Sequence, residues 1–183
     1  MSIARIDYNA PFTLTLFIAA LGMMFLARLL DLDALPMLVA QGDLRWGDPY
    51  FYSGLLLHPL AHGSWQHFLA NFTILLLIGP MLEEKYGSGA LALLALATAV
   101  LTGLLHAIFF SGGLIGASGL VFMAILLSSF ARCRGGTLPL TFLLVVVLYL
   151  GHEVLAAMES NNTSEFAHII GGICGAAFGF FKR

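Results

Sequence analysis

Residues 86–131 read YGSGALALLALATAVLTGLLHAIFFSGGLIGASGLVFMAILLSSFA and contain no Asp, Glu, Lys or Arg. Residues 49–82 and 135–152 are free of these charges as well. Because the hydrocarbon core of a bilayer is about 30 Å thick and a helix rises about 1.5 Å per residue, apolar runs of about 20 residues are typical of membrane-spanning helices. The chain is 60% hydrophobic and only 10% charged, whereas a soluble domain is about 25% charged. This composition excludes an ordinary soluble domain and predicts a polytopic membrane protein.

The few charged residues divide the chain into six predicted spans. We expect these spans at residues 12–30, 64–82, 89–109, 118–131, 137–156 and 165–181. The predicted fold is an all-α polytopic membrane protein, a single domain over residues 1–183, with a long first outer loop and a short internal helix that bears Ser118. Six spans put both termini on one side of the membrane, and most of the eight Lys and Arg residues fall on that side. Since cytoplasmic loops are rich in these cations, we expect both termini in the cytoplasm.

Net charge, cysteine positions and loop composition give further expectations about partners and location. A net charge of −2 provides no basic field for nucleic acid. The two cysteines, Cys133 and Cys174, are expected at cytoplasmic ends of spans, and this location disfavours a disulfide framework. The first outer loop, residues 31–63, contains aromatic side chains such as Trp46 and Tyr50. These residue types favour a loop that lies in the membrane interface.

Several polar side chains fall inside the predicted spans, at depths that the nearest charges define. Ser118 lies fourteen residues before Arg132, and His168 lies fourteen residues before Lys182. In helices, both therefore lie about 21 Å above the cytoplasmic cations. Asn71 and His67 come out about 18 and 24 Å above the same surface. Since polar groups at such depth are costly, their common layer predicts a functional site.

The chemistry of this layer points to a nucleophilic serine. The glycine-rich stretch 111–116 should break the helix, which leaves Ser118 at a helix N-terminus where free N–H groups favour a developing anion. His168 is the histidine at matching depth, and histidine is the usual base near neutral pH. Gly171, Gly175 and Gly179 share one helix face and would allow its helix to approach the serine helix. Asn71 and His62 can donate hydrogen bonds toward a carbonyl oxygen.

At these residues the chain resembles the rhomboid intramembrane serine proteases. The carrying segments are HGSWQHFLAN (62–71), EEKYGS (83–88), GASG (116–119) and AHIIGG (167–172). A lone G-x-S-G is a weak signal, but these segments occur in the order and on the spans that the family pattern requires. The resemblance implies the bacterial six-span core, with no cofactor and no metal.

The resemblance also implies a role for each matching residue. Ser118 matches the nucleophile and His168 the general base, without a carboxylate partner. His62 and Asn71 match side chains of the oxyanion hole, which the Ser118 backbone N–H completes, and Gly116 and Gly119 flank the serine. The structural positions that match are His67, Phe122, Glu83, Gly87, Gly171 and Gly172.

Two departures from the family pattern stand out. Phe122 occupies a position where many relatives have a tyrosine that stacks on the catalytic histidine, and phenylalanine keeps the stacking face. Relatives often have a Trp-Arg pair in the first outer loop, whereas Ser53 and Gly54 stand at the aligned stretch here. The second departure leaves open how this loop is anchored and whether it contacts substrate or lipid.

Simpler interpretations exist for single residues. Ser118 alone could be a small residue at a helix start, and His168 alone could be a buried core histidine; their shared depth and flanking motifs favour the dyad. A metal site at His62 and His67 is disfavoured by their i, i+5 spacing. We interpret three further histidines as interfacial residues without chemistry: His58, His106 and His152. Glu165 is interpreted as a solvated loop acid, although a tuning effect on His168 stays open.

We therefore expect an intramembrane serine endopeptidase that cleaves single-pass or multi-pass transmembrane substrates and contacts membrane lipid. The expected location is the bacterial inner membrane, with the active site open toward the outer side. One alternative is a specialised rhomboid that trims C-terminal anchor segments. Another is a catalytically inactive relative that binds membrane clients. A small transporter is disfavoured because the polar groups form one shallow layer rather than a continuous path.

Overall fold

The computed structural model describes residues 7–131, 137–157 and 163–182. Its helices are α1 (Pro11–Leu29), α2 (Pro49–Leu57), α3 (Trp65–Tyr86), α4 (Ser88–Phe109), α5 (Ser118–Ser128), α6 (Leu140–Ala157) and α7 (Thr163–Phe181). Two 3₁₀ turns, η1 (Pro36–Leu38) and η2 (His58–Leu60), and two short strands, β1 (Ala40–Gln41) and β2 (Gly113–Leu114), complete the elements. Arg132, Cys133 and the side chain of His152 lie outside the described part of the chain.

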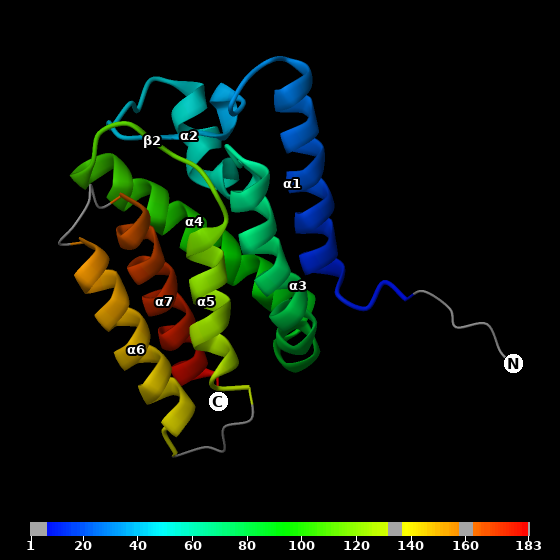
Figure 1. The fold of residues 1–183 in the computed structure, drawn as a ribbon, viewed down its shortest axis with the longest axis vertical. Helices are drawn as coiled ribbons and strands as arrows, with labels where there is room; N and C mark the ends of the chain where they lie inside the picture. Colours follow the sequence, from blue (N-terminus) through cyan, green and yellow to red (C-terminus); the bar gives the residue numbers. More distant parts are fainter. Residues whose placement is uncertain (1–6, 132–136, 158–162, 183) are drawn as a thin grey trace, which may run out of the picture.

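Helix α5 lies in the middle of the bundle (Figure 1). It packs most extensively against α7 and also contacts α3 and α4, whereas α6 contacts α7 from the periphery. The core between α1, α3 and α5 is aromatic and aliphatic, and Phe68, Phe72 and Val121 are almost completely buried there. The serine-bearing helix is therefore enclosed by the longer helices, and one of its neighbours is the helix that carries His168.

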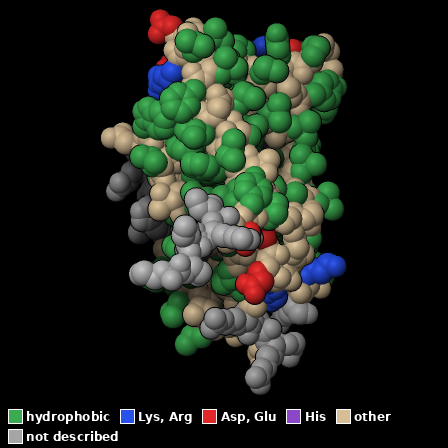
Figure 2. Space-filling model, turned by 90° about the vertical axis from the view of Figure 1, so that its right-hand side faces the viewer, with side chains coloured by type: hydrophobic (Ala, Val, Ile, Leu, Met, Phe, Trp, Pro, Cys, Tyr) green, Lys and Arg blue, Asp and Glu red, His purple; other side chains and the backbone are tan. Residues whose placement is uncertain are grey.

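The helices have the length and composition of membrane segments. Among the described residues, α1, α3 and α4 are long and apolar enough to cross a bilayer, whereas α5 and residues Glu165–Phe181 are shorter apolar helices. Figure 2 shows a broad band of hydrophobic side chains on one face, with acidic and basic side chains toward its two ends. The predicted mostly helical fold is thus confirmed, and length and composition identify three candidate spans among the described residues. The number of six spans stays a prediction.

Residues 31–63, called the first outer loop after their predicted location, form an ordered cap over one end of the bundle (Figure 1). Asp48 begins α2 as its N-cap, since its side chain accepts a hydrogen bond from the Tyr50 backbone N–H at 2.9 Å. Gly54 lies so close to the Val39 backbone that an added Cβ would collide with its carbonyl. At the stretch aligned with the Trp-Arg pair of many relatives, this chain therefore has a close backbone contact between Gly54 and Val39.

A small antiparallel sheet joins this loop to the segment before the serine. Ala40 of β1 pairs with Leu114 of β2, and Gln41 pairs with Gly113. Since β2 lies between α4 and α5, the glycine-rich stretch 111–116 does interrupt the helix, as the sequence predicts. This pairing attaches the backbone that leads into α5 to the first outer loop.

Glu83, near the C-terminal end of α3, connects this helix to the N-terminal end of α1. Its buried carboxylate accepts hydrogen bonds from the Phe12 and Thr13 backbone N–H groups at 3.0 and 2.8 Å, and from the Thr13 hydroxyl at 2.7 Å. The Ser88 hydroxyl is a further donor. Gly87, between α3 and α4, has a φ of 84°, which a residue with a Cβ rarely adopts. Together these two residues fix the turn from α3 to α4 and the start of α1.

Candidate active site

Ser118 is the first residue of α5 and is half-buried. The turn before it depends on Gly116, whose φ of 112° is favourable only for glycine. The Gly116 backbone N–H donates to the His58 carbonyl at 2.9 Å, and the His67 ring fills the space that a side chain at Gly116 would occupy. The backbone before Ser118 is therefore held by both the first outer loop and α3.

His168 reaches the serine helix because α7 is glycine-rich on the contact face. A Cβ at Gly171 would collide with the Gly119 carbonyl, and a Cβ at Gly175 would collide with the Met123 carbonyl. Gly172, by contrast, has only an ordinary contact with the Leu126 side chain. The approach of α7 to α5 thus depends on particular glycines of the face rather than on all small residues of the helix.

The imidazole of His168 lies against an aromatic ring. The centroids of the Phe122 and His168 rings are 4.4 Å apart, with an angle of 40° between the ring planes. Phe122 follows Ser118 by one helical turn of α5, so the Phe122 ring lies on the same side of the helix as Ser118. The contact restricts where the His168 ring can lie relative to α5.

Ser118 and His168 open into the same cavity of about 370 Å³. The side chains around it come from α3, α5, α7 and the segment before α5, and they are His67, Ala70, Asn71, Ile74, Leu114, Ile115, Ser118, Val121, Phe122 and His168. The four polar side chains that the sequence places in one layer, Ser118, His168, Asn71 and His67, therefore meet in one space. The remaining wall is apolar.

His62 lies behind this cavity rather than in its wall. Its Nε2 accepts a hydrogen bond from the Asn71 side-chain amide at 3.0 Å and a longer one from the Ala117 backbone N–H at 3.4 Å. The side chain is only 2% exposed. Burial, and the proximity of His67, lower the pKa of His62 to about 4, and the Leu60 carbonyl only partly offsets this shift. His62 is therefore a neutral acceptor in the folded protein.

His67 lines the cavity and His62 does not, whereas the family resemblance implies an oxyanion-hole role for His62. His67 and Asn71 are four residues apart on α3, so they share one face of the helix. The sequence feature that distinguishes His67 from His62 is thus its i, i+4 spacing to Asn71 within one helix. The His62 and His67 rings are in edge-to-face contact, with centroids 4.9 Å apart.

A comparison with known families identifies the family of the chain. Residues 50–183 match the family described as the Rhomboid domain. The chain belongs to the rhomboid family. No curated protein matches the chain. Rhomboid proteins are in general intramembrane serine proteases, so this rhomboid is an integral membrane protein of a protease family, as its apolar helices also indicate.

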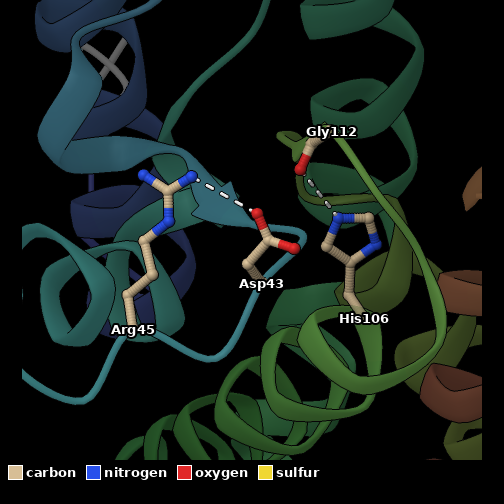
Figure 3. A network of polar contacts seen from close by, with 4 residues as sticks. All are labelled: Asp43, Arg45, His106 and Gly112. Carbon is tan, nitrogen blue, oxygen red and sulfur yellow. Dashed lines mark hydrogen bonds and ion pairs between the residues drawn. The ribbon is translucent and has the colours of Figure 1, made fainter.

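Two histidines of this rhomboid differ from their expected interfacial position. His106 is 1% exposed, and its Nε2 lies 3.4 Å from the Gly112 carbonyl, beside the Asp43–Arg45 pair of the first outer loop (Figure 3). His58 is 4% exposed, and its Nδ1 lies 3.1 Å from the Gly54 carbonyl. His106 lies under the folded outer loop and His58 lies on the buried side of that loop, which depth arithmetic along single helices cannot foresee.

The described residues of the rhomboid contain no group of three His, Cys, Asp or Glu side chains that could hold a metal ion. Glu165, in the first turn of α7, is not among the residues that line the cavity. The chemistry available in the cavity is therefore that of a hydroxyl, two imidazoles and an amide.

Proposed function

We propose that this rhomboid is a serine endopeptidase that cleaves transmembrane segments of membrane proteins through Ser118 and His168. The observation that carries the proposal is the shared cavity, into which the serine at the N-terminus of α5 and the histidine of α7 both open. The cavity has a volume of about 370 Å³, and its wall is apolar apart from its four polar side chains.

In the proposed reaction the Ser118 hydroxyl attacks the carbonyl carbon of the scissile bond while His168 takes the hydroxyl proton. The tetrahedral intermediate then collapses, the C–N bond breaks, and His168 passes the proton to the leaving amine. Water, deprotonated by the same imidazole, releases the acyl group from Ser118. Because a peptide bond in a helix is shielded by its own turn, the substrate must unwind first, which is easiest near glycine or proline.

We assign the stabilisation of the oxyanion to His67 and Asn71, together with the backbone N–H of Ser118. Both side chains line the cavity from one face of α3. His62 is less suited to this role, since its Nε2 already accepts hydrogen bonds from Asn71 and Ala117. His67 therefore takes the donor role that the family pattern alone suggested for His62.

The proposed topology has six spans, cytoplasmic termini and one domain in the bacterial inner membrane. A helix occupies each of the six predicted stretches. Leu114, which pairs with Ala40 of the first outer loop, and Ile115 form part of the cavity wall, and this supports an opening toward the predicted outer side. Substrates and lipid would reach the site from the membrane.

The test combines two assays on protein purified in detergent: labelling by a fluorophosphonate, and cleavage of a single-span reporter with glycines in its span. Wild type should label and cleave, whereas Ser118→Ala and His168→Ala should do neither. Ser128→Ala is the matched control, because Ser128 lies on the same helix and its hydroxyl donates to the Ile125 carbonyl. Equal behaviour of wild type and both dyad variants would overturn the dyad, and binding without cleavage would favour an inactive client-binding relative. A reporter cut only near its C-terminus would instead favour the anchor-trimming alternative.

A further inference from the structure

The side chain of His62 receives two hydrogen bonds on a single nitrogen. The Asn71 Nδ2 lies 3.0 Å and the Ala117 backbone nitrogen 3.4 Å from His62 Nε2. A backbone N–H can only donate, so His62 Nε2 carries no proton and the ring proton is on Nδ1. This fixes the tautomer of His62 from the geometry of its partners.

The tautomer in turn fixes the amide of Asn71. An acceptor nitrogen requires a donor opposite it, so the NH₂ group of Asn71, not its carbonyl oxygen, faces His62. The NH₂ group has a second hydrogen, and Asn71 is part of the cavity wall that contains Ser118 and His168. A rotated amide would place its carbonyl oxygen there, and that oxygen would repel a developing oxyanion.

The His62 ring is itself held in place. It is 2% exposed, and its centroid lies 5.5 Å from that of Phe68 and 5.6 Å from that of Phe72, two of the most buried side chains of α3. The ring also contacts His67 edge-to-face. A ring fixed on these sides presents its Nε2 at a constant position to Asn71.

We propose that His62 is a positioning residue: it acts through Asn71, holding the amide with its N–H available to the oxyanion that forms at Ser118. The inference rests on the proposed protease function. It assigns His62 no contact with substrate, which distinguishes its role from those of His67 and Asn71.

Two near-isosteric variants of His62 test directly whether an acceptor at the position of Nε2 is required. In His62→Gln the amide oxygen reaches the position of Nε2, whereas in His62→Asn it reaches only that of Nδ1. We expect His62→Gln to keep kcat for the reporter within about threefold of wild type and His62→Asn to lower it about 10- to 100-fold, less than the full loss of an oxyanion donor. KM should stay within about twofold in both. Equal kcat values of the two variants, at equal thermal midpoints in detergent, would overturn the proposal.

A double-mutant cycle separates positioning from a general structural role. His62→Asn should cost less than about threefold when it is made in Asn71→Ala, because the amide that it positions is already absent. The same factor in both backgrounds would show that His62 acts through the fold and would overturn the inference. Failure of the protease function itself is recognised separately, since wild type would then leave the reporter uncut. A detectable wild-type rate with unchanged His62→Asn kinetics would refute only the positioning role.

Discussion

At the scale of single residues, helical spacing and depth determine which polar groups can meet. The depths measured from the nearest charged residues select four polar side chains, and all four line one cavity: Ser118, His168, Asn71 and His67. What the sequence could not decide is which histidine faces the cavity, because His62 precedes α3 and its position depends on the path of the loop. The structure favours His67, which shares a helix face with Asn71.

His67→Ala should lower kcat for the reporter by about 10²–10³-fold, the usual cost of losing one oxyanion donor. The loss should fall on kcat rather than on KM, because the donor acts mainly on the charge that develops in the transition state. Leu69→Ala is the control, since this side chain of the same helix is 55% exposed on the outside of the bundle. A His67→Ala enzyme with wild-type kcat would contradict the assignment.

At the scale of elements, the site exists because α7 can approach α5 at backbone distance. The glycine face of α7 is visible in the sequence as a four-residue repeat, and its contact with α5 is what that repeat predicts. The sequence does not reveal which glycines are essential, because this depends on the rotation of one helix against the other. Gly171 faces the Gly119 carbonyl, whereas Gly172 has room beside Leu126.

Gly171→Ala should therefore separate the two helices and displace His168 from Ser118. We expect a destabilisation of about 1–3 kcal/mol, typical of overpacking, and a loss of reporter cleavage. Gly172→Ala adds the same methyl group one residue later, at 3.6 Å from the Leu126 Cγ, and should retain activity. Thermal midpoints in detergent and cleavage rates measure both effects, and equal tolerance of the two substitutions would refute this packing argument.

Glu83 offers a second test at this scale. Replacement by Gln removes the charge that receives the N–H groups of Phe12 and Thr13 at the start of α1. A hydrogen bond to a charged acceptor contributes about 1.5–3 kcal/mol and one to a neutral acceptor about 0.5–1.5 kcal/mol, so weakening these two bonds should lower the unfolding free energy by about 2–3 kcal/mol. Glu84→Gln, an exposed neighbour on the same helix, should have almost no effect. The prediction fails if both variants melt at the wild-type temperature.

At the scale of the whole molecule, charge scarcity predicts a membrane protein, and the break before Ser118 is predicted by its glycines. The small sheet between β1 and β2 and the burial of His58 within the outer loop were not predictable, because both depend on contacts between segments distant in sequence. Burial has an electrostatic consequence in this loop. It lowers the pKa of His58 to about 4, against the weaker opposing effect of the Gly54 and Leu55 carbonyls.

The stability of the protein should consequently decrease in acid. His58 and His62 both have a pKa of about 4 in the fold, against the ordinary value of 6.5, so the unfolded chain binds protons that the folded chain excludes. Stability should be constant above about pH 6.5 and decrease from there toward pH 4, by up to about 3 kcal/mol for each histidine. Thermal midpoints measured across this range in one detergent would show the trend. His58→Gln should flatten the curve, and a wild-type midpoint independent of pH would contradict the argument.

The position of the two dyad residues along the chain also bears on biosynthesis. Ser118 begins α5, whereas His168 lies on α7, which is separated from it by all of α6. Because the chain is made from its N-terminus, Ser118 leaves the ribosome before His168, and the proposed nucleophile stays unactivated until α7 docks. Under the proposed function, neighbouring proteins at the insertion site are exposed to a working protease only after the final helix has packed.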